Sequence, residues 1–477
     1  MALSGCEMGS DNRHTSLIVL RLRQSIISLG PILITISLGL AEGYSAILLP
    51  QLEEDPDWNI DTQLSSWIAS IATLPMPVGC LLGGWLLEII GRKWLHIATC
   101  IPNLMGWLLI AFSGRSIAML LAGRFITGMC VGVLSPVLSI YVAETSDPVF
   151  RGFLLPSISL ALNCGIATAH VMGTFLEWKL VALLACIFPA ACFVLMLFMP
   201  ESPTFLIKKN KTDDARKGFL WFRGDSEEST AEFGAIVSNQ KKEASLPKKT
   251  FIEYLGIFKS STFYKPLLIL LVFFSVMQCS GNNPIAFYTI NILRDVLGNS
   301  SVDAYTSMLI MDGVRIVASI LGCFGQQYLR RRVLMMLSCS GTLCSLFILS
   351  IYLFIAHNYD YLFNNLDLSS IAVLALAGFV LFTNIGLLPL PYSMTGELFA
   401  SSSRGLGSGI VSFFNMVLMF ILVKITPWLF EVLATEAVFL VFGLSCLVGL
   451  IVLIIILPET KDKPLHEIED YFNGKKN

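Results

Sequence analysis

The chain has 477 residues, of which 55% are apolar and 14% charged, and its net charge is −2. Soluble proteins carry about 25% charged residues, so this composition excludes a soluble enzyme, a nucleic-acid-binding protein and a secreted disulfide scaffold. The mean hydropathy of +0.72 instead indicates a protein that crosses a membrane many times.

Twelve apolar stretches follow one another along the chain, and each is long enough to cross a hydrocarbon layer of about 30 Å as a helix. They cover residues 25–49, 67–90, 94–112, 117–141, 153–175, 180–199, 266–293, 305–328, 333–355, 371–398, 406–428 and 437–457. The sequence therefore predicts an all-α membrane protein with twelve transmembrane helices.

One connection, residues 200–265, is long and strongly charged, and it divides the twelve spans into two sets of six. Residues 213–222 and 227–238 within it have helical patterning. The predicted organisation is an N-terminal tail, a six-helix half, a cytoplasmic linker with short helices, a second six-helix half and a C-terminal tail, at residues 1–24, 25–199, 200–265, 266–457 and 458–477.

The positive charges predict the orientation. If both termini lie on one side, 26 of the 32 Lys and Arg residues fall in the tails and loops of that side, and only Arg115, Lys179 and Arg294 fall on the other. Such an excess marks the cytoplasmic side, so both termini and the linker are expected in the cytoplasm. Asn299 begins an Asn-Ser-Ser sequon in an outside loop and is a predicted glycosylation site.

The two halves repeat the same charged pattern in the same order. Glu144 and Glu397 are each followed by an arginine seven residues later, and Pro-Glu closes each half. Duplicated halves are typical of secondary transporters that bind substrate near the midplane. We predict an inner gate of ion pairs between the halves, although plain loop charge is the alternative, from Arg92, Glu144, Arg151, Glu201, Arg331, Glu397, Arg404 and Glu459.

Charge inside a span is rare and often functional, and four such residues are candidates for a role. Glu42 and Arg124 lie at the same depth, roughly 12 Å from the outer side at 1.5 Å per residue, which makes an ion pair between them plausible. Asp312 and Arg315 are three residues apart and can pair on one helix face. His170 is a further titratable residue, for which a buried hydrogen bond is expected.

Several motifs in order resemble the sugar porter family of the major facilitator superfamily, in particular the insect facilitated trehalose and glucose transporters. The resemblance covers essentially the full chain and implies alternating access, cytoplasmic salt bridges and a plasma-membrane location. The motifs are Gly83–Lys93, Gly123-Arg124-Phe125, Tyr141–Glu144 with Arg151-Gly152, Pro200–Pro203, Gln278–Asn283, Pro389–Tyr392, Gly396–Phe399 and Pro458–Lys461.

The chain also departs from the family pattern. Ser159 stands where members usually have a glutamine, Arg315 where they have an asparagine, and Asn384 where they have a glutamate. Met277 precedes Gln278 in place of a paired glutamine, and Tyr392 replaces a usual tryptophan. These changes affect the expected sugar site more than the expected architecture.

A sugar site needs amide side chains for hydroxyl groups and an aromatic ring for the apolar C–H face. The candidates are predicted beside Pro284, Gly386, Pro389 and Pro391, which interrupt spans seven and ten; broken helices occur where they line a cavity or protein. The alternative is that the amides only bond between helices, at about 1 kcal/mol each. The predicted substrate-binding residues are Gln278, Asn283, Asn415, Asn384, Tyr392 and Ser159.

The predicted function is a transmembrane sugar transporter, for a hexose or trehalose, that works as a facilitative uniporter. Similar proton-coupled porters carry an aspartate directly after the Gly-Tyr of span one, where this chain has Ser45. A proton-coupled symporter using Glu42, a carrier of another polar or anionic solute using Arg315, and a non-transporting sensor stay open.

The sequence shows no group of reactive side chains that would predict an enzyme. No residue is assigned a catalytic role. The predicted partners are a small-molecule sugar and the lipid bilayer, without nucleic acid, cofactor or metal, and the chain is expected to act as a monomer.

Overall fold

The computed structural model describes residues 17–58, 60–245, 258–297, 303–358, 369–399, 403–461, 463 and 465–472. Within these residues every regular element is a helix. Eleven helices are long and apolar enough to cross a membrane, and the second expected span is divided between two shorter helices. The predicted all-α membrane fold is confirmed. The predicted glycosylation site Asn299 lies outside the described residues.

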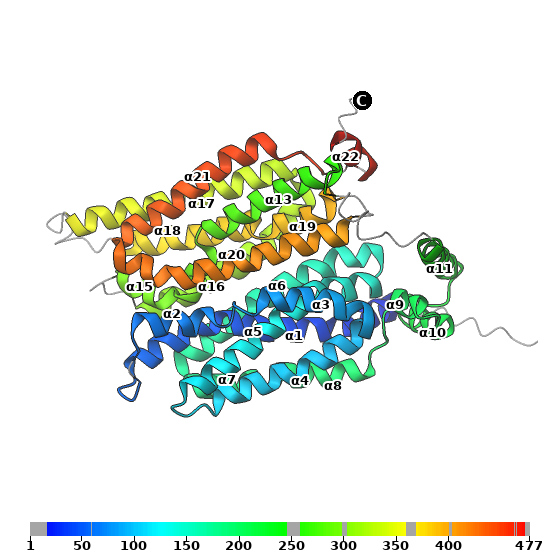
Figure 1. Cartoon of the computed structure of the whole chain (residues 1–477), viewed down its shortest axis with the longest axis horizontal. Helices are drawn as coiled ribbons and strands as arrows, with labels where there is room; N and C mark the ends of the chain where they lie inside the picture. Colours follow the sequence, from blue (N-terminus) through cyan, green and yellow to red (C-terminus); the bar gives the residue numbers. More distant parts are fainter. Residues whose placement is uncertain are drawn as a thin grey trace, which may run out of the picture.

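The first half of the chain folds into one bundle of helices, drawn in blue to green-cyan in Figure 1. Residues 71–75 interrupt the second span, and Cys186 interrupts the sixth. The helices are α1 (Leu17–Glu54), α2 (Thr62–Ser70), α3 (Met76–Ile90), α4 (Arg92–Ala111), α5 (Ile117–Thr145), α6 (Pro148–Phe175), α7 (Trp178–Ala185) and α8 (Ile187–Phe198).

The second half forms a separate bundle beside the first, drawn in green to red (Figure 1). Its seventh and tenth spans are divided into consecutive short segments. The helices are α13 (Ser261–Cys279), α14 (Asn282–Phe287), α15 (Thr289–Leu297), α16 (Ala304–Tyr328), α17 (Arg331–Asn358), α18 (Ser369–Phe382), η2 (Thr383–Leu387), α19 (Pro389–Leu398), α20 (Arg404–Val432) and α21 (Thr435–Ile456).

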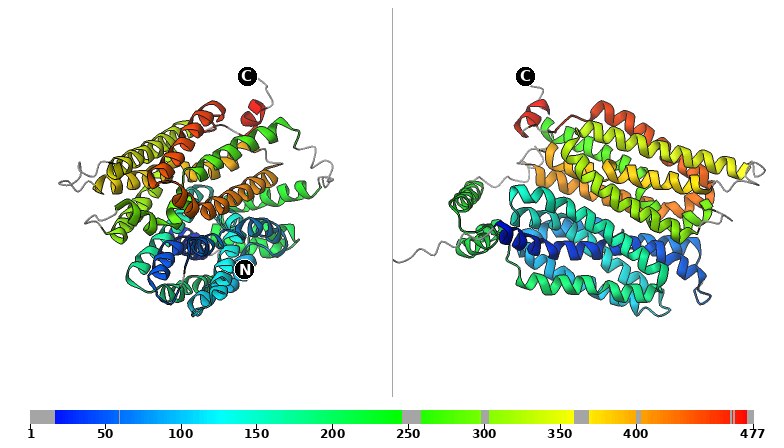
Figure 2. Two further views of the ribbon diagram at one scale, coloured as in Figure 1. Left: turned by 60° about the vertical axis from the view of Figure 1, so that its left-hand side comes forward. Right: turned by 180° about the vertical axis from the view of Figure 1, so that it is seen from behind.

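Four further helices, α9 (Pro203–Lys208), α10 (Thr212–Arg223), α11 (Glu227–Ser245) and α22 (Leu465–Phe472), lie at one end of the bundles (Figures 1 and 2). The start of α1 contacts α10 there, since Gln24 Nε2 donates to Phe222 O at 3.1 Å. Lys265 Nζ donates to Phe472 O at 3.0 Å and attaches α22 to the same end. We call this end the linker side and the other end the opposite side.

Small residues let the helices of each bundle approach closely, as is common in membrane proteins. Gly39 on α1 faces the backbone of α6, where a Cβ would collide with Leu162 O, and Gly165 on α6 faces Ile36 O of α1 in the same way. The α1–α6 contact therefore has no room for larger side chains, which fixes the position of α1 inside the first half.

The seventh and tenth spans are interrupted where the candidate substrate residues lie. Gly281 has a φ of +84°, so the chain turns between α13 and α14 in a conformation that favours glycine. The tenth span changes to a wider π-helical turn over Thr383–Leu387 before Pro389 starts α19. Such wide turns occur frequently at functional sites.

Candidate functional site

Four predicted side chains form one continuous chain of hydrogen bonds. Asn283 Nδ2 donates to Gln278 Oε1 at 2.7 Å, and Gln278 Nε2 donates to Asn415 Oδ1 at 2.7 Å. Asn415 Nδ2 then donates to Tyr392 Oη at 2.9 Å. We call these residues the amide chain. They come from α14, α13, α20 and α19, so the two broken spans and α20 assemble one polar surface.

The local structure explains why these residues meet. Gln278 is in the last turn of α13, and the turn at Gly281 brings Asn283 back onto it. Tyr392 follows η2, and the ring of Phe274 from α13 packs edge-on against it at 5.0 Å between centroids. Gln278 and Asn415 are buried. The amide chain is therefore held by packing as well as by hydrogen bonds.

Tyr392, at one end of the amide chain, is accessible and lies near the first half. It is within electrostatic reach of Glu42 and Cys80 from the first half, and 49% of its surface is exposed. Asn283, at the other end of the amide chain, is partly exposed. The ends of the chain can thus contact a solute, with an aromatic ring beside amide donors and acceptors.

The other two candidates are placed differently. Asn384 is buried in η2, and its Nδ2 donates to Val380 O of the preceding turn at 2.8 Å, so it belongs to the helix rather than to the amide chain. Ser159 is exposed on α6, one turn before Asn163, and residues four apart share a helix face. Asn163 Nδ2 donates to Ser319 Oγ of α16 at 2.7 Å. Sequence reasoning missed Asn163, although its position one turn after Ser159 was a usable signal.

A buried charged cluster joins the two halves within the membrane. His170 Nδ1 of α6 is 2.6 Å from Asp312 Oδ2 of α16, and Arg315 Nη1 donates to Asp312 Oδ1 at 2.5 Å. The Asp312–Arg315 pair is the one expected from their spacing on one helix. The position of His170 adds a bond between the halves that sequence reasoning had not assigned.

Further contacts join the halves on the opposite side. Asn291 Nδ2 donates to Glu53 Oε2 at 3.1 Å, and Arg294 Nη2 donates to Glu54 Oε1 at 2.5 Å. Lys424 Nζ also donates to Ser66 Oγ at 2.7 Å. With the cluster around Asp312, these bonds hold the opposite side together.

On the linker side, the described charges pair within each half. Arg92 Nε is 2.9 Å from Glu144 Oε2, and Arg331 Nη2 is 2.7 Å from Glu397 Oε1. The predicted gate pairs arginines and carboxylates of different halves, and neither of these two pairs does so. The physical reason is proximity: each arginine has a carboxylate of its own half within reach for two-point pairing.

Glu201 and Glu459 occupy equivalent places in the two halves. Glu201 Oε1 accepts from the backbone N–H of Arg92 at 3.0 Å, and Glu459 Oε1 accepts from that of Arg331 at 2.9 Å. Each carboxylate thus satisfies free N–H groups at a helix start. Burial raises the pKa of Glu201. Burial acts in the same direction on Glu459, but backbone N–H donors and Arg331 outweigh it and lower its pKa.

The remaining two arginines of the predicted gate have unused donors. The Nε atoms of Arg151 and Arg404 are buried and have no hydrogen-bond partner among the described residues. Arg151 lines a cavity of about 270 Å³ between the first half and the linker helices, together with Glu144 and Arg223. The ion pairs described above on the linker side each lie within one half. The described bonds between the halves lie in the membrane interior and on the opposite side.

The expected Glu42–Arg124 pair is not formed. Arg124 Nη1 donates to Ala41 O at 2.9 Å, and Nη2 donates to Ser45 Oγ. Ala41 and Ser45 share a face of α1, whereas Glu42 is rotated from it by about 100°. Equal depth in the membrane was therefore not enough to place Glu42 beside Arg124.

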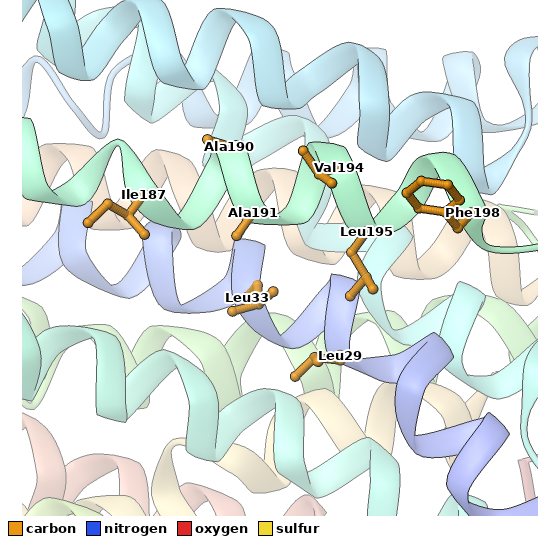
Figure 3. A pocket seen from close by; sticks show the side chains of 8 residues that line it. All are labelled: Leu29, Leu33, Ile187, Ala190, Ala191, Val194, Leu195 and Phe198. Atoms are coloured by element: carbon orange, nitrogen blue, oxygen red, sulfur yellow. The ribbon is translucent and has the colours of Figure 1, made fainter.

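An apolar groove lies on the outer face of the first half, between α1 and α8 (Figure 3). Its lining includes Leu33, Ala191, Val194 and Phe198, and none of its residues is polar. This groove offers no hydrogen-bonding group to a polar solute, which leaves the amide chain as the candidate site.

The protein consists of two helical halves that are bonded to each other on one side, and a polar site lies in the second half. This is the architecture of a secondary transporter of the major facilitator fold. The model of the family described as "Sugar (and other) transporter" matches residues 26–472. The chain belongs to this family, which confirms the resemblance drawn from its motifs and its assignment as a transporter rather than an enzyme.

Known proteins support the same assignment. The chain is 32% identical over 453 residues to the facilitated trehalose transporter Tret1 of Culex quinquefasciatus, covering 93% of this chain and 85% of that protein. It is 30% identical over 458 residues to the facilitated trehalose transporter Tret1-2 homolog of Drosophila simulans, covering 95% and 91%. The partially occluded inward-open conformation of the xylose transporter XylE from E. coli matches with a TM-score of 0.75 at 16% identity, over 93% of this chain and 100% of that one, and shares its fold.

Proposed function

We propose that the protein carries a sugar, trehalose or a hexose, across the plasma membrane by alternating access, as a facilitative uniporter. The observation that carries this proposal is the amide chain of Asn283, Gln278, Asn415 and Tyr392. Amide groups exchange hydrogen bonds with neutral hydroxyls, and a tyrosine ring can pack on the C–H face of a sugar. The facilitated trehalose transporters among the relatives support the substrate class.

Two features favour transport of a neutral solute without a coupled proton. Arg124 is bonded to the neutral oxygens of Ala41 and Ser45 rather than to a carboxylate. Arg315, the residue that suggested an anionic solute, already has Asp312 as its counter-ion. Its charge is therefore compensated before any solute binds.

We further propose that the linker side faces the cytoplasm and that one chain is the transporting unit. The excess of Lys and Arg on that side supports the orientation. The predicted gate then closes when the halves approach on the linker side, and the unused donors of Arg151 and Arg404 are available for carboxylates of the other half.

The proposal is tested with purified protein in liposomes, by counterflow of labelled trehalose and glucose with and without a pH gradient. Counterflow of at least one sugar, unaffected by the gradient, is expected. Absence of counterflow for every sugar tested contradicts sugar transport. Sugar accumulation driven by the pH gradient contradicts facilitative transport.

The site is tested with Gln278→Ala, which removes the centre of the amide chain. Net contributions of about 1–2 kcal/mol correspond to a half-saturation concentration raised about fivefold to thirtyfold. The matched control is Asn103→Ala, which removes a buried amide that bonds Ser37 inside the first half at 3.3 Å. An unchanged half-saturation concentration in Gln278→Ala, or an equal rise in the control, contradicts the assigned site.

A further inference from the structure

Glu42 is a carboxylate on α1 that has no assigned partner. It is half-buried, and within the described parts of the chain it makes no hydrogen bond or close ion pair. Removing a carboxylate from water without a partner is costly, and ionisable residues inside membrane spans are mostly functional. A packing role does not require a charged side chain at this position.

Glu42 lies near polar groups of the second half of the protein. The groups within its electrostatic reach are Arg315 of α16 and Tyr392 of α19, the terminal residue of the amide chain. The neighbouring face of α1, with Ala41 and Ser45, is occupied by Arg124. Glu42 therefore comes from the first half toward the polar surface of the second half.

The groups around Glu42 leave its oxygens free to accept hydrogen bonds. Arg315 is held on Asp312 at 2.5 Å and does not form a close pair with Glu42. The hydroxyl oxygen of Tyr392 accepts from Asn415 at 2.9 Å, and among the described hydrogen bonds its O–H does not donate to Glu42. A carboxylate has two acceptor oxygens and no donor, so it suits a solute that presents hydroxyl groups.

We infer that Glu42 binds hydroxyl groups of the transported sugar from the first half, opposite the amide chain, and sets specificity for a sugar with two neighbouring hydroxyls at that position. This inference rests on the proposed function. It makes the sugar a bridge between the halves, because the amide chain lies wholly in the second half. A sugar that bonds both surfaces favours their approach, as alternating access requires.

The test combines variants with altered sugars. Glu42→Gln keeps the size of the side chain but replaces one acceptor oxygen with a donor. Half-saturation for the transported sugar is expected to rise about tenfold or more, because hydrogen bonds to charged groups are the stronger class. Among single-deoxy analogues, those lacking a hydroxyl bound by Glu42 should lose affinity in the native protein and lose much less in Glu42→Gln.

This non-additive pattern distinguishes direct contact from a structural role, which would weaken all analogues equally. The control is Glu177→Gln, an equal charge change at the exposed start of α7, and it should leave half-saturation unchanged. If Glu42→Gln does not fold, as judged by gel filtration and thermal unfolding, Glu42→Asp is measured with the same analogues, and a retained analogue preference with weaker binding is expected.

Three outcomes overturn the inference: equal half-saturation in Glu42→Gln and the native protein, losses that add for every analogue, or uptake driven by a pH gradient that disappears in Glu42→Gln while exchange continues. The last outcome makes Glu42 a proton carrier. Failure of the proposed function is recognised separately, since the native protein then shows no sugar counterflow at all.

Discussion

Replacing His170 by Phe should favour the conformation in which the opposite side is open. The variant keeps a ring in the buried position but loses the bond from Nδ1 to Asp312 at 2.6 Å, whereas the Asp312–Arg315 pair at 2.5 Å lies within α16 and remains. Only the bond between the halves is removed. A hydrogen bond to a charged group contributes about 1.5–3 kcal/mol, so the ratio of the two conformations should change roughly tenfold to 150-fold.

The change can be measured by the distance between spin labels on the opposite side. Gln63 of α2 and Asp295 of α15 are exposed and belong to different halves, so labels there should move apart as the halves separate. His96→Phe is the matched control, because His96 is a buried histidine that contacts Arg92 O at 2.8 Å within the first half. An unchanged distance distribution in His170→Phe, or the same change in His96→Phe, refutes the assigned role of the Asp312 cluster.

Two further predictions concern the linker side. Glu144→Gln or Arg404→Gln should shift the population toward the conformation open on the linker side and slow transport up to about fivefold, because single ion pairs near the protein surface contribute roughly 0–1 kcal/mol each. Substrate binding should persist, and a normal transport rate contradicts the gate. A single cysteine introduced at exposed Lys209, between α9 and α10, should react with a membrane-impermeant maleimide only after cells are permeabilised. One at exposed Asp57 should react in intact cells, and the reverse result contradicts the proposed orientation.

The architecture was predictable because it depends on local properties of the sequence. Hydropathy over about twenty residues identifies a span whatever its neighbours are, so the twelve spans and the two halves followed directly. The second span differs from the prediction because it is not one continuous helix: residues 71–75 interrupt it. Breaks in spans seven and ten were predicted from proline and glycine, which act on the backbone locally.

The site was predictable only in part. Gln278, Asn283, Asn415 and Tyr392 were grouped by residue type and motif, and the fold joins them in one chain of hydrogen bonds. Asn384 satisfies its amide on its own helix, which residue type could not indicate. Asn163 was missed because an amide within an apolar span shows its role only when its partner, Ser319 of the other half, is known.

The sequence by itself determined the spans, the repeat and the residues available for polar chemistry, because each depends on composition and on neighbours along the chain. Which charges pair was decided only by tertiary structure. Glu42 and Arg124 share a depth but point in different directions, and Arg92 takes the carboxylate nearest in its own half, Glu144. Ion pairing depends on the rotation of each helix about its axis and on the distance between helices, and both are set by packing among segments far apart in the chain.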